Sequence, residues 1–181
     1  MEDGVSFHAN LPLEWQPLGD AERHAVEVWM HTNVVLLRAL STIEAQPPLS
    51  DYENEPGSPT GRMLERLEAK VDLALALMGR LLSQEQPAPW PTPLTLSARA
   101  VEWQADALPP AGSPVLITLH ISPRLPQPLR LAAIVKHSGQ GSAKAVFTHL
   151  GEEMQDWLER TVFRQHRRHI QARHLARKQE N

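Results

Sequence analysis

The chain has 181 residues, of which 41% are hydrophobic and 22% charged, a composition typical of one globular domain or of one domain with an extension. It contains no cysteine, which excludes disulfides, thiol catalysis and cysteine zinc sites and favours a cytoplasmic location. The net charge of −3 argues against nucleic-acid binding over the whole chain. The polar N-terminal sequence MEDGVSFHAN predicts no secretion signal, and no run approaches the ~20 apolar residues of a membrane span.

The N-terminal residues 1–19 contain the run LPLEWQPL, in which Leu11, Leu13 and Trp15 occupy alternate positions. Alternation of this kind favours an extended segment. Two prolines interrupt the run, and proline is tolerated mainly at the edges of sheets. We therefore expect an edge strand that lies against another part of the molecule.

Two long helices are expected next, at residues 20–45 and 59–85, on either side of a proline-rich and acidic connector. The predicted core face of the first helix carries apolar or small residues at spacings of three and four: Ala25, Val28, Thr32, Val35 and Ala39. Four further apolar residues widen this face: Trp29, Leu36, Leu40 and Ile43.

The second predicted helix has a heptad pattern. Its a and d positions are apolar for nearly three repeats, at Leu64, Leu67, Val71, Ala74, Met78 and Leu81. Further leucines widen the apolar surface beyond this seam, so one narrow interface does not cover it. We expect this helix to join copies of the chain into a dimer or tetramer. The alternative is packing within one chain, against the first helix or the β-domain.

The second half of the chain has the pattern of a β-domain. Strands with alternating apolar residues are predicted near 94–103, 115–121, 129–135 and 143–147. A last helix follows Gly151, with acids in its first turns, bases toward its end and an apolar face suited to cap the strands. The prediction is an α+β protein with an oligomerisation unit at 1–86 and a small antiparallel β-barrel with a C-terminal helix at 87–181.

The runs TLSARAVEW, VLITLHI, PLRLAAIV and AVFTHL, followed by the helix EEMQDWLERTVFRQHR, resemble the PilZ domain family over roughly residues 90–170. The resemblance implies a small antiparallel barrel, no enzymatic activity and a role in bacterial cyclic di-GMP signalling. It also implies two ligand motifs, an RxxxR arginine pair before the barrel and (D/N)xSxxG at its start.

The second motif falls on Thr95, Ser97, Arg99 and Ala100, and only Ser97 matches it. Thr95 stands where the family has a carboxylate or amide, and it lacks their acceptor oxygens. Ala100 replaces a glycine, which carries a steric cost where φ is positive or a ligand approaches closely. No pair with the RxxxR spacing lies between Pro87 and Leu94, whereas the spacing occurs elsewhere, for example at Arg62 with Arg66, Arg160 with Arg164, and Arg164 with Arg168.

With these departures, the chain resembles a degenerate branch of the PilZ family. Some members of that branch have long helices beside the barrel and oligomerise through them. The resemblance thus implies an adaptor of cyclic di-GMP signalling with weak or no nucleotide binding. Its partners would be copies of itself and proteins of motility or second-messenger pathways. The alternatives are a true cyclic di-GMP receptor with a non-standard arginine pair and a structural oligomerisation protein. No cofactor is predicted, and cyclic di-GMP is the ligand that the resemblance suggests.

Other chemistry-bearing residues favour no enzyme, metal site or nucleic-acid site. No histidine and acid are spaced around Ser97 as in a catalytic triad, and no phosphate-binding loop motif is present. His166 and His169 share a helix face but have no third ligand at a suitable spacing. Residues 160–181 hold seven Lys and Arg against one acid, and we read them as a solvated helix end. Trp90, between two prolines, is a candidate for contact with a partner.

Overall fold

The structure is a computed structural model of the chain. It describes residues 5–44, 67, 71, 88–125 and 127–179, without the side chains of residues 21 and 172–179.

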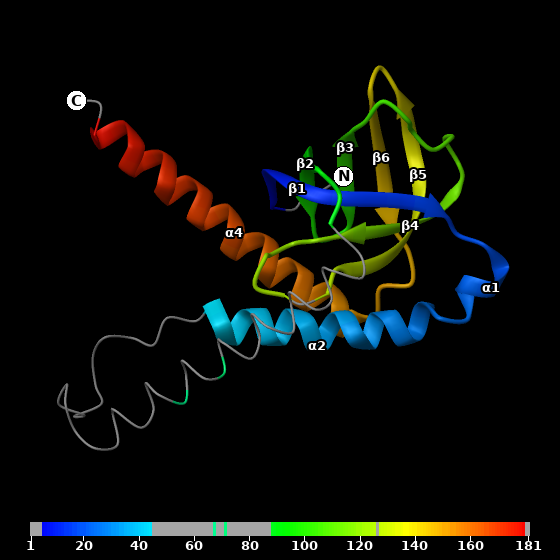
Figure 1. Cartoon of the computed structure of the whole chain (residues 1–181), viewed down its shortest axis with the longest axis horizontal. Coiled ribbons are helices and arrows are strands. Elements are labelled where there is room, and N and C mark those ends of the chain that lie inside the picture. Colours follow the sequence, from blue (N-terminus) through cyan, green and yellow to red (C-terminus); the bar gives the residue numbers. More distant parts are fainter. Residues whose placement is uncertain (1–4, 45–66, 68–70, 72–87, 126, 180–181) are drawn as a thin grey trace.

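A closed antiparallel barrel is the centre of the described fold, with the strand order β1-β2-β3-β6-β5-β4 (Figure 1). Its strands are β1 (Ser6–Pro17), β2 (Pro91–Ser97), β3 (Ala100–Gln104), β4 (Pro114–Leu119), β5 (Leu129–Gly139) and β6 (Ser142–Phe147). Alternate residues point inward, so that strands with the burial pattern of β3 and β6 place every second side chain in the core. The predicted class, α+β with a small antiparallel barrel, is confirmed.

Strand β1 closes the barrel, because it pairs with two different neighbours along its length. Residues from Ser6 to Pro12 pair with β2, and residues from Leu13 to Pro17 pair with β4. The prediction of an edge strand was wrong. Both prolines of the run occupy the last pair of a ladder, where a missing N–H costs little. The predicted unit 1–86 thus contributes a strand to the barrel, while its boundary at residue 86 lies outside the described residues.

Three helices are described: the single turn α1 (Asp20–Arg23), α2 (Val26–Glu44) and α4 (Glu152–Gln179). One long N-terminal helix, α2, therefore takes the place of the first predicted helix. The second predicted helix, 59–85, lies outside the described residues except at Leu67 and Val71. Both of these side chains are exposed.

Helices α2 and α4 fill one end of the barrel and pack against each other (Figure 1). Met154, Leu158 and Val162 of α4 are buried in the same hydrophobic core as Trp103 of β3. The prediction that this face of the last helix caps the strands is confirmed. Beyond the barrel, α4 continues as a projecting helix that ends far from the strands (Figure 1).

Helix α2 packs on the barrel with only part of the predicted face, the part that contains Leu36 and Leu40. Leu37 and Leu40 are fully buried in the main core, whereas Val28 and Val35 of the predicted face are 65% and 52% exposed. The helix carries two apolar stripes, and the barrel covers the one with the larger side chains. Burial of the larger stripe removes more apolar surface from water and is therefore favoured.

One buried polar side chain holds α2 on the barrel. Asn33, 1% exposed, donates from Nδ2 to the carbonyl oxygen of Arg130 at 2.8 Å and accepts from the Arg130 N–H at 3.1 Å. Arg130 belongs to β5 at a point where β6, which ends in the pair of Phe147 with Ala133, no longer reaches. The amide of Asn33 thus replaces the missing neighbour strand and satisfies both backbone groups.

We predict that Asn33→Ala lowers the free energy of unfolding by about 2 kcal/mol, since it removes two hydrogen bonds and leaves two backbone groups without partners. Urea unfolding followed by far-ultraviolet circular dichroism measures the change. The control is Thr42→Ala, on an exposed site of the same helix. An Asn33 variant as stable as the control would contradict this role.

Candidate functional site

The predicted ligand motif forms the tight turn between β2 and β3, and Ser97 organises this turn. Its hydroxyl oxygen accepts hydrogen bonds from the N–H groups of Arg99 at 3.3 Å and Ala100 at 3.0 Å. The hydroxyl also donates to the carbonyl oxygen of Ala100 at 3.1 Å. The hydroxyl of Ser97, the one residue that matches the motif, therefore makes its hydrogen bonds within the turn itself.

The neighbouring motif residues also have partners within the chain. Thr95 Oγ1 lies 2.7 Å from Nδ1 of His8, on the adjacent strand β1. Arg99 donates from Nη2 and Nε to the side-chain oxygen of Gln155 at 3.0 and 3.1 Å, with the amide turned so that its oxygen faces the guanidinium. The structure thus brings Thr95, Ser97, Arg99 and Ala100 together, in a turn that contacts the first turns of α4.

Trp157 of α4 has two guanidinium groups close to its ring. Arg38 of α2 stands 5.7 Å and Arg160 of α4 stands 5.3 Å from the centre of its ring, both within cation–π range. Arg38 also forms an ion pair with Glu153. The Trp157 ring is partly buried and packs against the main hydrophobic core.

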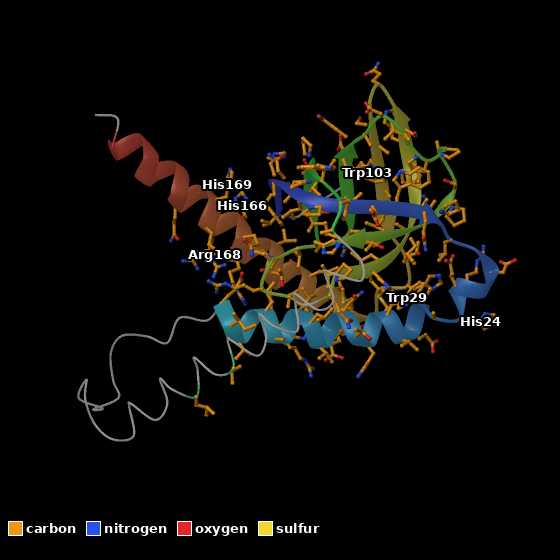
Figure 2. The ribbon with its side chains drawn as sticks, viewed as in Figure 1. His24, Trp29, Trp103, His166, Arg168 and His169 are labelled. Carbon is orange, nitrogen blue, oxygen red and sulfur yellow. The ribbon has the colours of Figure 1, made fainter. Side chains whose placement is uncertain are left out.

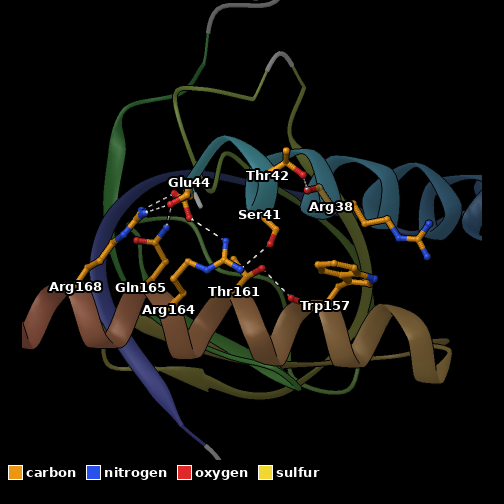
Figure 3. Close-up of polar contacts among 9 residues, drawn as sticks. All are labelled: Arg38, Ser41, Thr42, Glu44, Trp157, Thr161, Arg164, Gln165 and Arg168. Carbon is orange, nitrogen blue, oxygen red and sulfur yellow. Dashed lines mark hydrogen bonds and ion pairs between the residues drawn. The ribbon is translucent and has the colours of Figure 1, made fainter. Parts of the chain in front are cut away.

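A second polar cluster joins the end of α2 to α4, and we call it the Glu44 junction (Figure 3). The Glu44 side chain is 4% exposed, with Oε1 at 2.7 Å from Nη1 of Arg168 and Oε2 at 3.5 Å from Nη1 of Arg164. Gln165 Nε2 donates to Oε1 at 3.2 Å. Arg164 Nη2 donates to the hydroxyl of Ser41 at 2.8 Å, and Arg168 Nη2 to the carbonyl oxygen of Glu44 at 3.3 Å.

The Glu44 junction contains one of the arginine pairs with RxxxR spacing on the last helix. Arg164 and Arg168 have the RxxxR spacing, and both bind a carboxylate of their own chain. Arg160, the other member of a spaced pair, stacks on Trp157. Arg62 and Arg66 lie outside the described residues. Sequence spacing pointed to the arginines but not to their acceptor, because Glu44 is more than a hundred residues distant in the chain.

Two sets of apolar side chains in the N-terminal half of the sequence face solvent. Val28 and Val35 lie seven residues apart on α2, so that they are exposed on the same face of the helix. Leu67 and Val71 of the predicted heptad seam are 59% and 50% exposed. The other predicted oligomerisation residues lie outside the described part of the chain: Leu64, Ala74, Met78 and Leu81.

The remaining candidates add no further site. His166, Arg168 and His169 lie along α4 as it leaves the barrel (Figure 2). Within the described residues no group of three or more potential metal ligands is found. None of the described helices is long and apolar enough to cross a membrane.

Comparisons with known proteins agree with this architecture. A family model described as "Atypical PilZ domain, cyclic di-GMP receptor" matches residues 37–174, more than half of the chain. A solved protein of Xanthomonas campestris is similar at 29% identity and a TM-score of 0.71, over 94% of this chain and 92% of that one. It is described as a new tetrameric PilZ domain self-assembled via an unusual helical bundle. Comparison with curated proteins found no match.

We predict that Ser97→Ala lowers the free energy of unfolding by about 1 kcal/mol, because the turn between β2 and β3 loses the acceptor of two N–H groups. Ser97→Thr retains the hydroxyl and should recover most of the loss. Chemical unfolding of the two variants beside the unchanged protein measures the difference. Equal stability of all three proteins would show that the hydroxyl does not hold the turn.

Proposed function

The chain belongs to the atypical PilZ domain family, and we propose that it is an oligomeric adaptor of bacterial cyclic di-GMP signalling that binds the nucleotide weakly or not at all. One observation supports the weak binding above all others. The polar groups of the motif turn, at Thr95, Ser97 and Arg99, are engaged by partners of the same chain. A ligand would have to break these contacts before it gained its own.

The chemistry of the nucleotide makes the same point. Cyclic di-GMP carries two phosphates, which require guanidinium groups held free in a suitable geometry, and two guanines, which require polar edges. Arg164 and Arg168 are held by Glu44, and Arg99 is held by Gln155. The family description names a cyclic di-GMP receptor. The alternative function is therefore a receptor that uses another arginine pair, such as Arg62 with Arg66.

Exposed apolar seams support self-association. Val28 and Val35 on α2 have the seven-residue spacing of a coiled-coil position, and Leu67 and Val71 are successive d and a positions of the predicted heptad helix at 59–85. Apolar seams of this kind are normally covered by another helix. The similar Xanthomonas protein is described as self-assembled via a helical bundle. A dimer or tetramer built through residues 59–85 would cover both seams and leave the barrels outside the bundle.

We propose that a protein partner binds the barrels of the assembly. Trp90 is 91% exposed immediately before β2, and the prolines on both sides restrict its backbone. A rigid and exposed tryptophan loses little conformational freedom when it enters an interface. Proteins of motility or second-messenger pathways are the proposed partners. A third reading, a structural oligomer without a signalling role, would lose support if such proteins were captured with this chain.

Isothermal calorimetry with cyclic di-GMP tests the nucleotide part of the proposal. We expect no heat of binding at micromolar nucleotide, because Arg99, Arg164 and Arg168 have partners within the chain. Two variants separate the possible sites, namely Arg99→Gln in the motif turn and Arg62→Gln with Arg66→Gln on the predicted helix. Micromolar or tighter binding that either variant removes would establish the receptor alternative.

Light scattering coupled to size exclusion tests self-association. We expect a mass of two or four chains for the unchanged protein. Leu67→Asp with Val71→Asp should reduce it to the mass of one chain, because charges in an apolar seam must be desolvated. The control is Phe163→Asp, another exposed apolar residue, at 49%, on α4. A single-chain mass for the unchanged protein at micromolar concentration would reject the proposal.

A further inference from the structure

The Glu44 junction places a buried charge where the fold does not require one for stability. The barrel end is already filled by apolar side chains of α2 and α4. Ion pairs with a buried member add little net stability, since desolvation of the charges offsets their attraction. Apolar residues of similar size often replace such clusters without loss of stability. The cluster instead fixes the direction of the end of α2 relative to α4, because guanidinium groups and a carboxylate bind each other only in a narrow range of geometries.

The Glu44 junction lies at the point where the chain leaves α2 toward the predicted association helix. Glu44 is the last residue of α2, and the chain next leads toward the predicted association helix at 59–85. Arg168 binds both the side chain of Glu44 and its backbone carbonyl oxygen. The last described carbonyl of α2 is therefore bound from outside the helix, by a side chain of α4. The last turn of α2 is thus attached to α4 through side chain and backbone together.

We infer that Glu44, Arg164 and Arg168 act as a positioning joint, which sets the direction in which the chain leaves the barrel toward its self-association segment. The inference rests on the proposed self-association. In an assembly of several copies, every barrel must leave the bundle at the same angle. A flexible exit at residue 44 would permit several arrangements, whereas a joint attached at three points selects one.

The same cluster explains why the spaced arginines of α4 are unavailable to an external anion. Glu44 is covalently part of the chain, so that its carboxylate is always present beside the two guanidinium groups. A free phosphate would have to displace it at a far higher effective concentration. Arg164 and Arg168 are therefore positioning residues that act through Glu44, and they are not ligand-binding residues.

The test removes the charges of the junction without leaving any of them unpaired. The junction variant carries Glu44→Met, Arg164→Met and Arg168→Met. Its matched control carries Arg38→Met, Glu153→Met and Arg160→Met, which removes one acid and two arginines from the same two helices around Trp157. Both variants have the same composition and the same net charge. Any difference between them therefore reports the location of the lost charges.

Thermal unfolding and sedimentation equilibrium are measured on both variants and on the unchanged protein. We expect the three barrels to melt at closely similar temperatures. The unchanged protein and the control should form a single assembly, whereas the junction variant should form a mixture of masses or dissociate at a concentration roughly tenfold higher. A junction variant that forms the same single assembly as the control would overturn the inference. A junction variant that does not fold would also overturn it, because the cluster would then act on stability.

Hydrogen exchange separates a failure of this inference from a failure of the proposed assembly. If the unchanged protein is a single chain at every concentration, self-association is rejected and the joint is judged on the monomer. The joint then requires roughly tenfold faster exchange in the last turn of α2 in the junction variant than in the control, with unchanged exchange in the strands. Equal exchange in the two variants would reject the joint on its own terms.

Discussion

The end of the barrel that α2 and α4 fill together is the constraint on which the rest of the structure depends. Six strands enclose an apolar interior, and its end must be covered to keep water out of the core. The two covering helices come from opposite halves of the sequence, so that neither can take its place without the other. Their mutual contact then brings Glu44 to Arg164 and Arg168, and Arg38 to Trp157. The polar junctions are consequences of a hydrophobic closure.

Local patterns predicted much of this fold, and long-range competition explains what they missed. Alternation along β3 and β6 identifies strands because each has one face buried in the core and a second face that is more exposed. The stripe on α2 that contains Val28 was a reasonable core face in isolation. Only the barrel decides which part of this wide face is buried, and it buries the side with Leu36 and Leu40, together with Leu37. The closing role of β1 was equally invisible, since its partners lie some eighty residues or more away.

The candidate site shows the same division between local and distant information. Comparison of motif letters predicted that Thr95 to Ala100 had departed from a ligand-binding pattern. It could not show that Ser97 holds the β2–β3 turn or that Arg99 is bound by Gln155. Spacing alone marked Arg164 with Arg168 as a possible phosphate-binding pair. The acceptor that occupies this pair is Glu44, and only the packing of α2 against α4 brings it there.

Helix α2 therefore has two apolar surfaces with different roles. Its larger apolar stripe is used within the chain, by the barrel, and its smaller stripe around Val28 and Val35 remains exposed. Apolar contact alone tolerates sliding and rotation, whereas directed polar bonds do not. Asn33 and Glu44 attach the inner face of the helix at its middle and at its end. With α2 held in this way, the orientation of the exposed stripe relative to the barrel is set before any second copy arrives, which lowers the ordering cost of association.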